Sequence, residues 1–280
     1  MFIIDLKNNV GYNYAMRIER IKLKKLSNTR DLGGFPTESG KTIKYGKLIR
    51  SGRLYNIPEE TVASLEAMHI TTIVDLRIER ERLDYPCVEI KGAKQVNLPL
   101  VITATTGITY TKSMASTMNA ESKRIKKEFG TADEYMKSVY EIILFDKQSQ
   151  AKLKEFFDLV IADENCILWH CNAGKDRTGI TAMLLESVLG VDEKLIIDDY
   201  VISNKFQRTK RTLQKAGLLI APIRHDFKQI LYVLMKAKPT FITSSISAIK
   251  ERYGTVINYC KEALGLTDDD INFLRDKYLE

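Results

Sequence analysis

Residues 166–180 read Cys-Ile-Leu-Trp-His-Cys-Asn-Ala-Gly-Lys-Asp-Arg-Thr-Gly-Ile. The apolar run that opens this stretch is typical of a buried β-strand, and it stops at the pair His170-Cys171. A short loop with one glycine follows and closes at Arg177, after which residues 180–189 carry apolar side chains at helical spacing. The stretch therefore predicts a strand, a loop and a helix in succession, with a cysteine at the carboxyl end of the strand.

A loop in this position lies where open α/β sheets bind their ligands. Backbone N–H groups and the helix dipole favour an anion there, so we expect the amides of residues 172–177 to surround the oxygens of a phosphate. The guanidinium of Arg177 can hold two of those oxygens, and the same field favours the thiolate form of Cys171. A thiolate beneath a bound phosphate is an in-line nucleophile for phosphoryl transfer.

Residues 170–179 match the signature His-Cys-x5-Arg-Thr/Ser of the cysteine-dependent phosphatases. The closer form, His-Cys-x-x-Gly-Lys-Asp-Arg-Thr-Gly, resembles the bacterial atypical tyrosine and dual-specificity phosphatases, including members that also accept phosphoinositides. The resemblance implies a phosphocysteine intermediate on Cys171, which is hydrolysed in a second step. It also implies that neither a metal nor another cofactor takes part.

Three segments nearer the N-terminus resemble hallmarks of the same family. They are Asn-Thr-Arg-Asp-Leu-Gly-Gly-Phe at 28–35, Leu-Ile-Arg-Ser-Gly-Arg-Leu at 48–54, and Ile-Val-Asp-Leu-Arg at 73–77. Together with the cysteine segment they occur in the family's order and cover residues 28 to 180. The residues after 180 carry a weaker resemblance.

The expected fold class is α/β, with a cysteine-phosphatase-like, mostly parallel central sheet flanked by helices. We expect residues 1–280 to form a single phosphatase domain, because no repeat, long linker or low-complexity tract marks a boundary. Residues 101–130 are irregular and rich in Thr and Ser, and by analogy with relatives they are interpreted as a lid-like insertion; a surface excursion is the alternative. Residues 227–280 are predicted to be entirely helical.

Composition sets further bounds. The chain is 44% hydrophobic over 280 residues, enough for a large core, and it has no apolar run as long as a membrane span. Its N-terminus does not resemble a signal peptide, so we expect a cytoplasmic protein or one exported without a recognisable signal peptide. Four cysteines without metal-ligand spacing argue against a disulfide framework. A net charge of +7 suits anionic substrates, although an ordinary soluble surface explains it equally well.

Several side chains are candidates for holding the substrate or its loop. Lys175 supplies positive charge where family members that accept inositol phospholipids carry it, and solvation of the loop is the alternative. Thr178 can donate its hydroxyl to the Cys171 sulfur or cap the helix, while His170 is expected to support the loop rather than touch the substrate. The full candidate set is His170, Asn172, Ala173, Gly174, Lys175, Thr178, Arg77 and Arg53.

Two other strand ends carry charged residues. Asp75 and Arg77 follow a predicted buried strand at residues 70–76, where either catalysis or a structural ion pair explains them. Arg50 and Arg53 follow another short strand, and either the phosphate site or surface salt bridges account for them. The charged run at residues 79–82 is interpreted as a solvated surface.

The general acid is harder to assign. The leaving oxygen needs a proton, and a water must then be activated. Many tyrosine phosphatases use an aspartate on a loop that begins with Trp-Pro, but the only tryptophan here is Trp169. Asp176, inside the loop, is the first choice, and Asp75 is the second.

The predicted activity is phosphomonoester hydrolysis, on phosphotyrosine proteins and on phosphoserine, phosphothreonine or phosphoinositides as further substrates. Phosphate, sulfate or vanadate should bind in the loop, transient contact with an anionic membrane is an open option, and no nucleic-acid motif is present. The alternatives are a phosphoinositide-specific lipid phosphatase, a phosphate-binding pseudoenzyme, and a thiol-based sulfurtransferase or oxidoreductase. The last class would not require Arg177 or the Gly-Lys-Asp pattern.

Overall fold

A computed structural model describes residues 18–100, 123–207 and 225–280. Its centre is a five-stranded sheet with the strand order β1-β2-β5-β3-β4. The strands are β1 (Arg30–Asp31), β2 (Leu48–Ser51), β3 (Thr72–Asp75), β4 (Lys94–Asn97) and β5 (Ile167–His170). Only the edge strand β1 is antiparallel to its neighbour, so the expected mostly parallel α/β sheet is confirmed.

The register brings the carboxyl ends of the parallel strands to one edge. His170 at the end of β5 lies opposite Ser51 of β2 and Asp75 of β3. Asp75 in turn lies opposite Asn97 of β4. The loop that follows His170 therefore begins in the middle of this edge, between two neighbouring parallel strands.

The sheet has a core on each face because side chains alternate along a strand. Ile73 and Leu168 belong to a smaller core with Leu65 of helix α1 (Glu59–Glu66). Val74 and Trp169, one residue further along, belong to the large core of the opposite face. Nearly all the other helices cover that second face.

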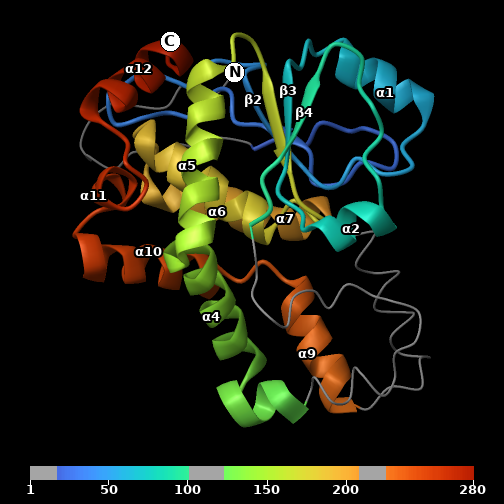
Figure 1. The fold of residues 1–280 in the computed structure, drawn as a ribbon, viewed down its shortest axis with the longest axis vertical. Helices are drawn as coiled ribbons and strands as arrows, with labels where there is room; N and C mark the ends of the chain where they lie inside the picture. The colour runs from blue at the N-terminus through green and yellow to red at the C-terminus, as the bar shows by residue number, and fades with distance from the viewer. Residues whose placement is uncertain (1–17, 101–122, 208–224) are drawn as a thin grey trace, which may run out of the picture.

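Two long helices precede the central strand, and a bundle of helices follows it (Figure 1). Several of them begin after residues whose type favours an N-cap in the sequence, including Asp192 before α7 (Glu193–Phe206) and Thr267 before α12 (Asp268–Tyr278). The remaining helices are α2 (Glu79–Asp84), α4 (Ala132–Phe145), α5 (Lys147–Ala162), α6 (Asp176–Val188), α7 (Glu193–Phe206), α9 (His225–Met235), α10 (Pro239–Tyr253), α11 (Val256–Glu262) and α12 (Asp268–Tyr278). The C-terminal helices pack on α4, α5, α6 and α7, as expected for a helical C-terminal region.

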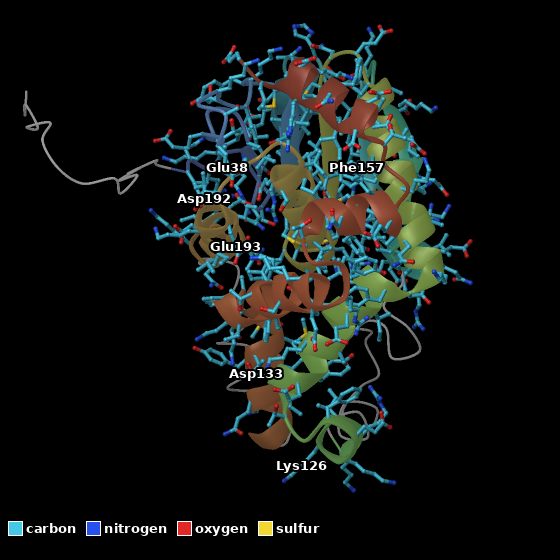
Figure 2. The ribbon with its side chains drawn as sticks, turned by 90° about the vertical axis from the view of Figure 1, so that its left-hand side faces the viewer. Glu38, Lys126, Asp133, Phe157, Asp192 and Glu193 are labelled. Atoms are coloured by element: carbon cyan, nitrogen blue, oxygen red, sulfur yellow. The ribbon has the colours of Figure 1, made fainter. Side chains whose placement is uncertain are left out.

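Helix α4 extends beyond the sheet and carries α9 alongside it (Figure 1). Figure 2 shows Lys126 and Asp133 at this end of the molecule, opposite the end that holds Glu38. Asp133 accepts a hydrogen bond from Lys238 Nζ at 2.5 Å, which ties the start of α4 to the start of α10. The end of α9 is thereby held close to the central helices.

Some predicted elements differ from the structure or lie outside it. The alternating basic and apolar residues 17–23 are typical of an exposed strand, but the described part, residues 18–23, forms no strand, although the Ile21 N–H donates to Thr29 O. Within the predicted lid at 101–130, residues 123–129 are helical, and residues 101–122 lie outside the described residues, so the lid stays a prediction. The organisation into one domain also stays a prediction.

None of the helices in the three described segments combines the length and the apolar character that crossing a lipid bilayer requires.

Candidate active site

The predicted strand, loop and helix are all present around Cys171. β5 ends at His170, and α6 begins at Asp176, so that Asp176 and Arg177 occupy its first turn rather than preceding it. Residues 171–175 form the connecting loop. The loop thus joins the middle of the sheet's carboxyl edge to the N-terminus of a buried helix, a position that favours anion binding.

Three consecutive loop carbonyls accept hydrogen bonds from the surrounding framework. The contacts are Arg53 N to Asn172 O at 3.3 Å, Gln207 Nε2 to Ala173 O at 2.7 Å, and Asn28 Nδ2 to Gly174 O at 2.6 Å. In a planar trans peptide the carbonyl and the next residue's N–H point in opposite directions. The N–H groups of Ala173, Gly174 and Lys175 therefore face away from this framework, in the arrangement of an anion-binding nest.

Two glycines are required by close approaches at the loop. Gly174 has a φ of +64°, and a Cβ there would lie 2.4 Å from the carbonyl oxygen of Ser51. A Cβ on Gly179 would lie 3.0 Å from the Tyr200 ring and 3.5 Å from Arg50 Nη2. Any side chain at position 174 would therefore push the loop away from β2.

Arg177 is buried and forms a two-pronged ion pair with Glu81. Its Nη1 donates to Glu81 Oε2 at 2.6 Å and its Nη2 donates to Glu81 Oε1 at 2.8 Å, while Nη1 also donates to Leu76 O. Burial opposes a charged guanidinium, but the hydrogen bonds and charge of Glu81 raise the pKa of Arg177 above its ordinary value. Burial would likewise raise the pKa of Glu81, and Arg177 lowers it instead.

This ion pair corrects the interpretation of residues 79–82 as a solvated run. Glu79 is exposed, but Glu81 is 4% exposed and turns inward from α2. A run of alternating charges contains no signal that separates these two residues, because only the tertiary fold brings α2 over the loop. Glu81 is the main site residue that sequence reasoning missed.

Cys171 lies at the base of the loop and is 3% exposed. The hydroxyl of Thr178, expected to donate to the Cys171 sulfur, is buried and has no hydrogen-bond partner among the described residues. Thr178 is inside α6 and does not cap it, since Lys175 is the residue at the N-cap. The hydroxyl is thus a free donor next to the first turn of the helix.

His170 is fully buried and holds the loop through its ring. Its Nδ1 lies 3.1 Å from Cys171 O, and its Nε2 lies 3.3 Å from Cys87 Sγ. Burial lowers the pKa of His170 despite the opposing charge of Asp75, so the imidazole is neutral near pH 7. This is the supporting position expected for His170.

Asp75 and Arg77 form a buried ion pair with each other. Arg77 Nη2 donates to Asp75 Oδ2 at 2.7 Å, and Arg77 Nε donates to Asp75 Oδ1 at 2.9 Å. Arg77 also donates to Tyr85 O, which fixes its guanidinium further. Burial would raise the pKa of Asp75, but His170 and Arg77 lower it. Both charged groups are therefore occupied by protein partners.

Asp176 stands in a different environment. Its side chain is 23% exposed, and its Oδ1 accepts a hydrogen bond from Tyr140 Oη at 2.5 Å. The Tyr140 hydroxyl lies 2.6 Å from that of Tyr200, so two helices, α4 and α7, supply the partners. Lys175 Nζ lies 3.3 Å from the same Asp176 oxygen.

Lys175 is buried, and its ammonium group reaches away from the loop. Lys175 Nζ donates to Leu234 O at 2.6 Å and to Lys236 O at 2.9 Å, at the end of α9. A lysine at this place satisfies helix carbonyls that have no partner within the helix. The structure thus connects the loop directly to the C-terminus of α9.

Arg50 inside β2 and Arg53 just after it take different directions. Arg53 Nη1 donates to Asn172 Oδ1 at 2.6 Å, and its guanidinium lies 3.8 Å from the centre of the Tyr85 ring, so Arg53 borders the loop. Arg50 points inward and pairs with Asp199 of α7. Arg50 is buried, as are all four residues of β2, so a surface salt bridge is the wrong interpretation of it.

Comparisons with known proteins agree with this geometry. A sequence profile described as the tyrosine phosphatase family matches residues 21–280. A tyrosine-protein phosphatase of Cupriavidus necator is 28% identical over 91% of this chain and 86% of its own length. The triple specificity protein phosphatase PtpB of Mycobacterium tuberculosis is 24% identical over 89% of this chain and 95% of its own length.

Among solved structures, P. aeruginosa TpbA in complex with phosphotyrosine is 19% identical, covering 57% of this chain and 70% of its own, with a TM-score of 0.27. The family assignment rests on the sequence profile, which spans nearly all of the chain. The chain belongs to the tyrosine phosphatase family.

Proposed function

We propose that this protein hydrolyses phosphotyrosine on proteins through a phosphocysteine formed on Cys171. The observation that carries the proposal is the loop itself: three outward carbonyls, their inward-facing amides, and a fixed guanidinium at the start of α6. These groups favour a tetrahedral oxyanion above the cysteine sulfur and stabilise the charge that develops during phosphoryl transfer.

The N–H donors of Arg177 that Glu81 and Leu76 do not use suit a phosphoryl group. Arginine has five N–H donors, and Glu81 and Leu76 accept both hydrogens of Nη1 and one of Nη2. The hydrogens that remain are on Nε and Nη2, which lie on one edge of the guanidinium. This pair matches two phosphoryl oxygens in a bidentate contact.

The proposed reaction has two steps. The Cys171 sulfur attacks phosphorus, and the tyrosine oxygen leaves with a proton from Asp176. A water then attacks the phosphocysteine while Asp176 accepts its proton, and phosphate and the Cys171 thiolate are released. The Thr178 hydroxyl makes no hydrogen bond to the Cys171 sulfur in this structure, so its donation to the leaving sulfur stays a prediction.

Asp176 suits the acid–base role better than Asp75 does. Asp176 is partly exposed, and both of its side-chain contacts, from Tyr140 and Lys175, are on Oδ1, so Oδ2 can reach a substrate oxygen. Both oxygens of Asp75 are engaged by Arg77. A carboxylate paired in this way can take up and deliver a proton only after it loses its partner.

The wider substrate range that we propose includes phosphoserine, phosphothreonine and phosphoinositides. One relative carries the name triple specificity phosphatase, and Lys175 supplies a cation next to the loop. Its present partners are two neutral carbonyls and, at 3.3 Å, the Asp176 carboxylate. A second phosphate on an inositol ring can replace the carbonyls as the stronger acceptor.

The test of catalysis is turnover of p-nitrophenyl phosphate by the wild-type protein and by Cys171→Ser. We expect the variant to lose turnover and to keep its affinity for inorganic phosphate, because the amides and Arg177 are intact. Turnover by Cys171→Ser at the wild-type rate would contradict the proposal.

The test of the substrate range compares a phosphotyrosine peptide, a phosphoserine peptide and a phosphoinositide. Lys175→Met should reduce kcat/KM for the phosphoinositide more than for the phosphotyrosine peptide, and Lys147→Met, an exposed lysine on α5, serves as the control. Equal losses on both substrates would remove Lys175 from phosphoinositide recognition.

A further inference from the structure

A buried charge cluster lies beneath the loop, on the side away from the bound anion. It is defined as Arg30 of β1, Arg50 of β2, Asp199 of α7 and Glu186 of α6, all of which are at most 1% exposed. Arg30 Nε donates to Asp199 Oδ1 at 2.6 Å, and Arg50 Nη1 donates to Asp199 Oδ2. One aspartate therefore holds two guanidinium groups.

The cluster is connected to the loop carbonyls by hydrogen bonds. Arg30 Nη1 donates to Asn28 Oδ1 at 2.7 Å, which orients the Asn28 amide so that its Nδ2 donates to Gly174 O. Arg50 Nη2 approaches the same Gly174 oxygen at 3.5 Å. The cluster thus helps to orient the Gly174 carbonyl. Because the peptide bond is planar and trans, the Lys175 N–H then points in the opposite direction.

Arg50 brings a positive charge into contact with the loop, because its Nη2 lies 3.5 Å from Gly174 O. Its side chain is 1% exposed, so water screens this charge little. Burial and the negative charge of Asp199 raise the pKa of Glu186, whereas Arg30 and Arg50 lower the pKa of Asp199.

We infer that Arg30, Arg50 and Asp199 form a positioning cluster that orients the loop carbonyls, and that the buried positive charge of Arg50 beside the loop stabilises the anionic forms of Cys171 and of a bound phosphoryl group. This inference rests on the proposed function. None of the cluster residues touches the substrate; they act through Gly174, Asn28 and the electric field. A charge in a low-dielectric interior is weakly screened, so its effect reaches the loop.

Arg50→Met is the decisive variant. It removes one buried positive charge and the contact with Gly174, and it leaves Arg30 and Asp199 as a buried ion pair. We expect the pH midpoint of Cys171 alkylation by iodoacetamide to rise by about one unit, and inorganic phosphate to bind about tenfold more weakly. The midpoint of thermal unfolding should stay the same or increase.

Two further variants separate charge from geometry. Arg50→Lys keeps the charge, but a single ammonium group cannot span both Asp199 and Gly174. It should keep the alkylation midpoint of the wild type and lose part of the phosphate affinity. Arg275→Met is the matched control, because Arg275 Nε donates to Val188 O at the far end of α6, about 20 Å from the loop at 1.5 Å per residue.

The results that would overturn this inference differ from the result that would contradict the proposed function. If the wild-type protein hydrolyses p-nitrophenyl phosphate but Arg50→Met and Arg275→Met give the same alkylation midpoint and phosphate affinity, the inference is overturned. An equal rise of the alkylation midpoint in Arg50→Lys and Arg50→Met also overturns the inference. Lysine keeps the positive charge, so the rise would then not result from loss of that charge. If Arg50→Met does not fold, Arg50→Lys carries the test. A wild-type protein without turnover contradicts the proposed function instead.

Discussion

Replacing Glu81 by glutamine tests how Arg177, the arginine that we propose binds phosphate, is held in place. The wild-type carboxylate accepts from both terminal nitrogens of Arg177 at 2.6 and 2.8 Å, in surroundings where both side chains are buried. Glutamine has nearly the same volume, but it offers one neutral acceptor and places an NH2 group against a guanidinium donor. Removing one partner of a buried ion pair costs about 3 kcal/mol of stability, because the other charge stays buried.

The variant should also lose about a hundredfold in kcat/KM, since a guanidinium displaced by about 1 Å no longer matches the transition state. Urea unfolding and steady-state kinetics with p-nitrophenyl phosphate measure the two effects. Glu79→Gln is the control, because Glu79 is an exposed residue of the same helix α2. A Glu81→Gln protein with the stability and kcat/KM of Glu79→Gln would refute the positioning of Arg177 by Glu81.

Three further predictions concern the loop and its supports. Asp176→Asn should lower kcat about a hundredfold for phenyl phosphate, a poor leaving group, and much less for p-nitrophenyl phosphate; equal losses would transfer the acid role to Asp75. Burial lowers the folded-state pKa of His170, so its contribution to stability is present above about pH 6.5 and is lost at lower pH, by up to about 1.4 kcal/mol per unit. Urea unfolding from pH 7 to 5 should show this slope, and a His170→Asn protein with an identical slope would contradict it. Gly174→Ala should reduce kcat/KM at least about tenfold, because the added Cβ would lie 2.4 Å from a backbone oxygen. Gly130→Ala is the control: Gly130 has a similar φ, but its surroundings leave room for a Cβ, so this variant should retain activity.

The local structure around Cys171 could be predicted from the sequence because its signals are local. An apolar run, a glycine-containing loop and a helical spacing follow one another within fifteen residues. The carboxyl edge of the sheet, where Asp75 and His170 meet, follows from parallel strands that each end in polar residues. Helix caps at Asp192 and Thr267 are equally local and are also found where the sequence predicts them.

The partners of the site residues could not be predicted in this way. Glu81, Tyr140 and Asp199 come from three helices that approach the loop only in the folded chain. The sequence around each of these residues has the ordinary pattern of an amphipathic helix. That local pattern does not show which side of the helix packs against the loop. Arg50 belongs with these residues: the sequence offered the phosphate site or a surface salt bridge for it, and only the folded chain shows its buried partner, Asp199.

The covalent intermediate is the central claim, and mass spectrometry of acid-quenched enzyme tests it most directly. The wild-type protein, mixed with p-nitrophenyl phosphate and quenched within one turnover, should carry a phosphoryl group on the peptide that contains Cys171. The Cys171→Ser protein treated in the same way should carry none. A turning-over wild-type enzyme with no phosphoryl group on that peptide, or with one on another residue, would contradict the account.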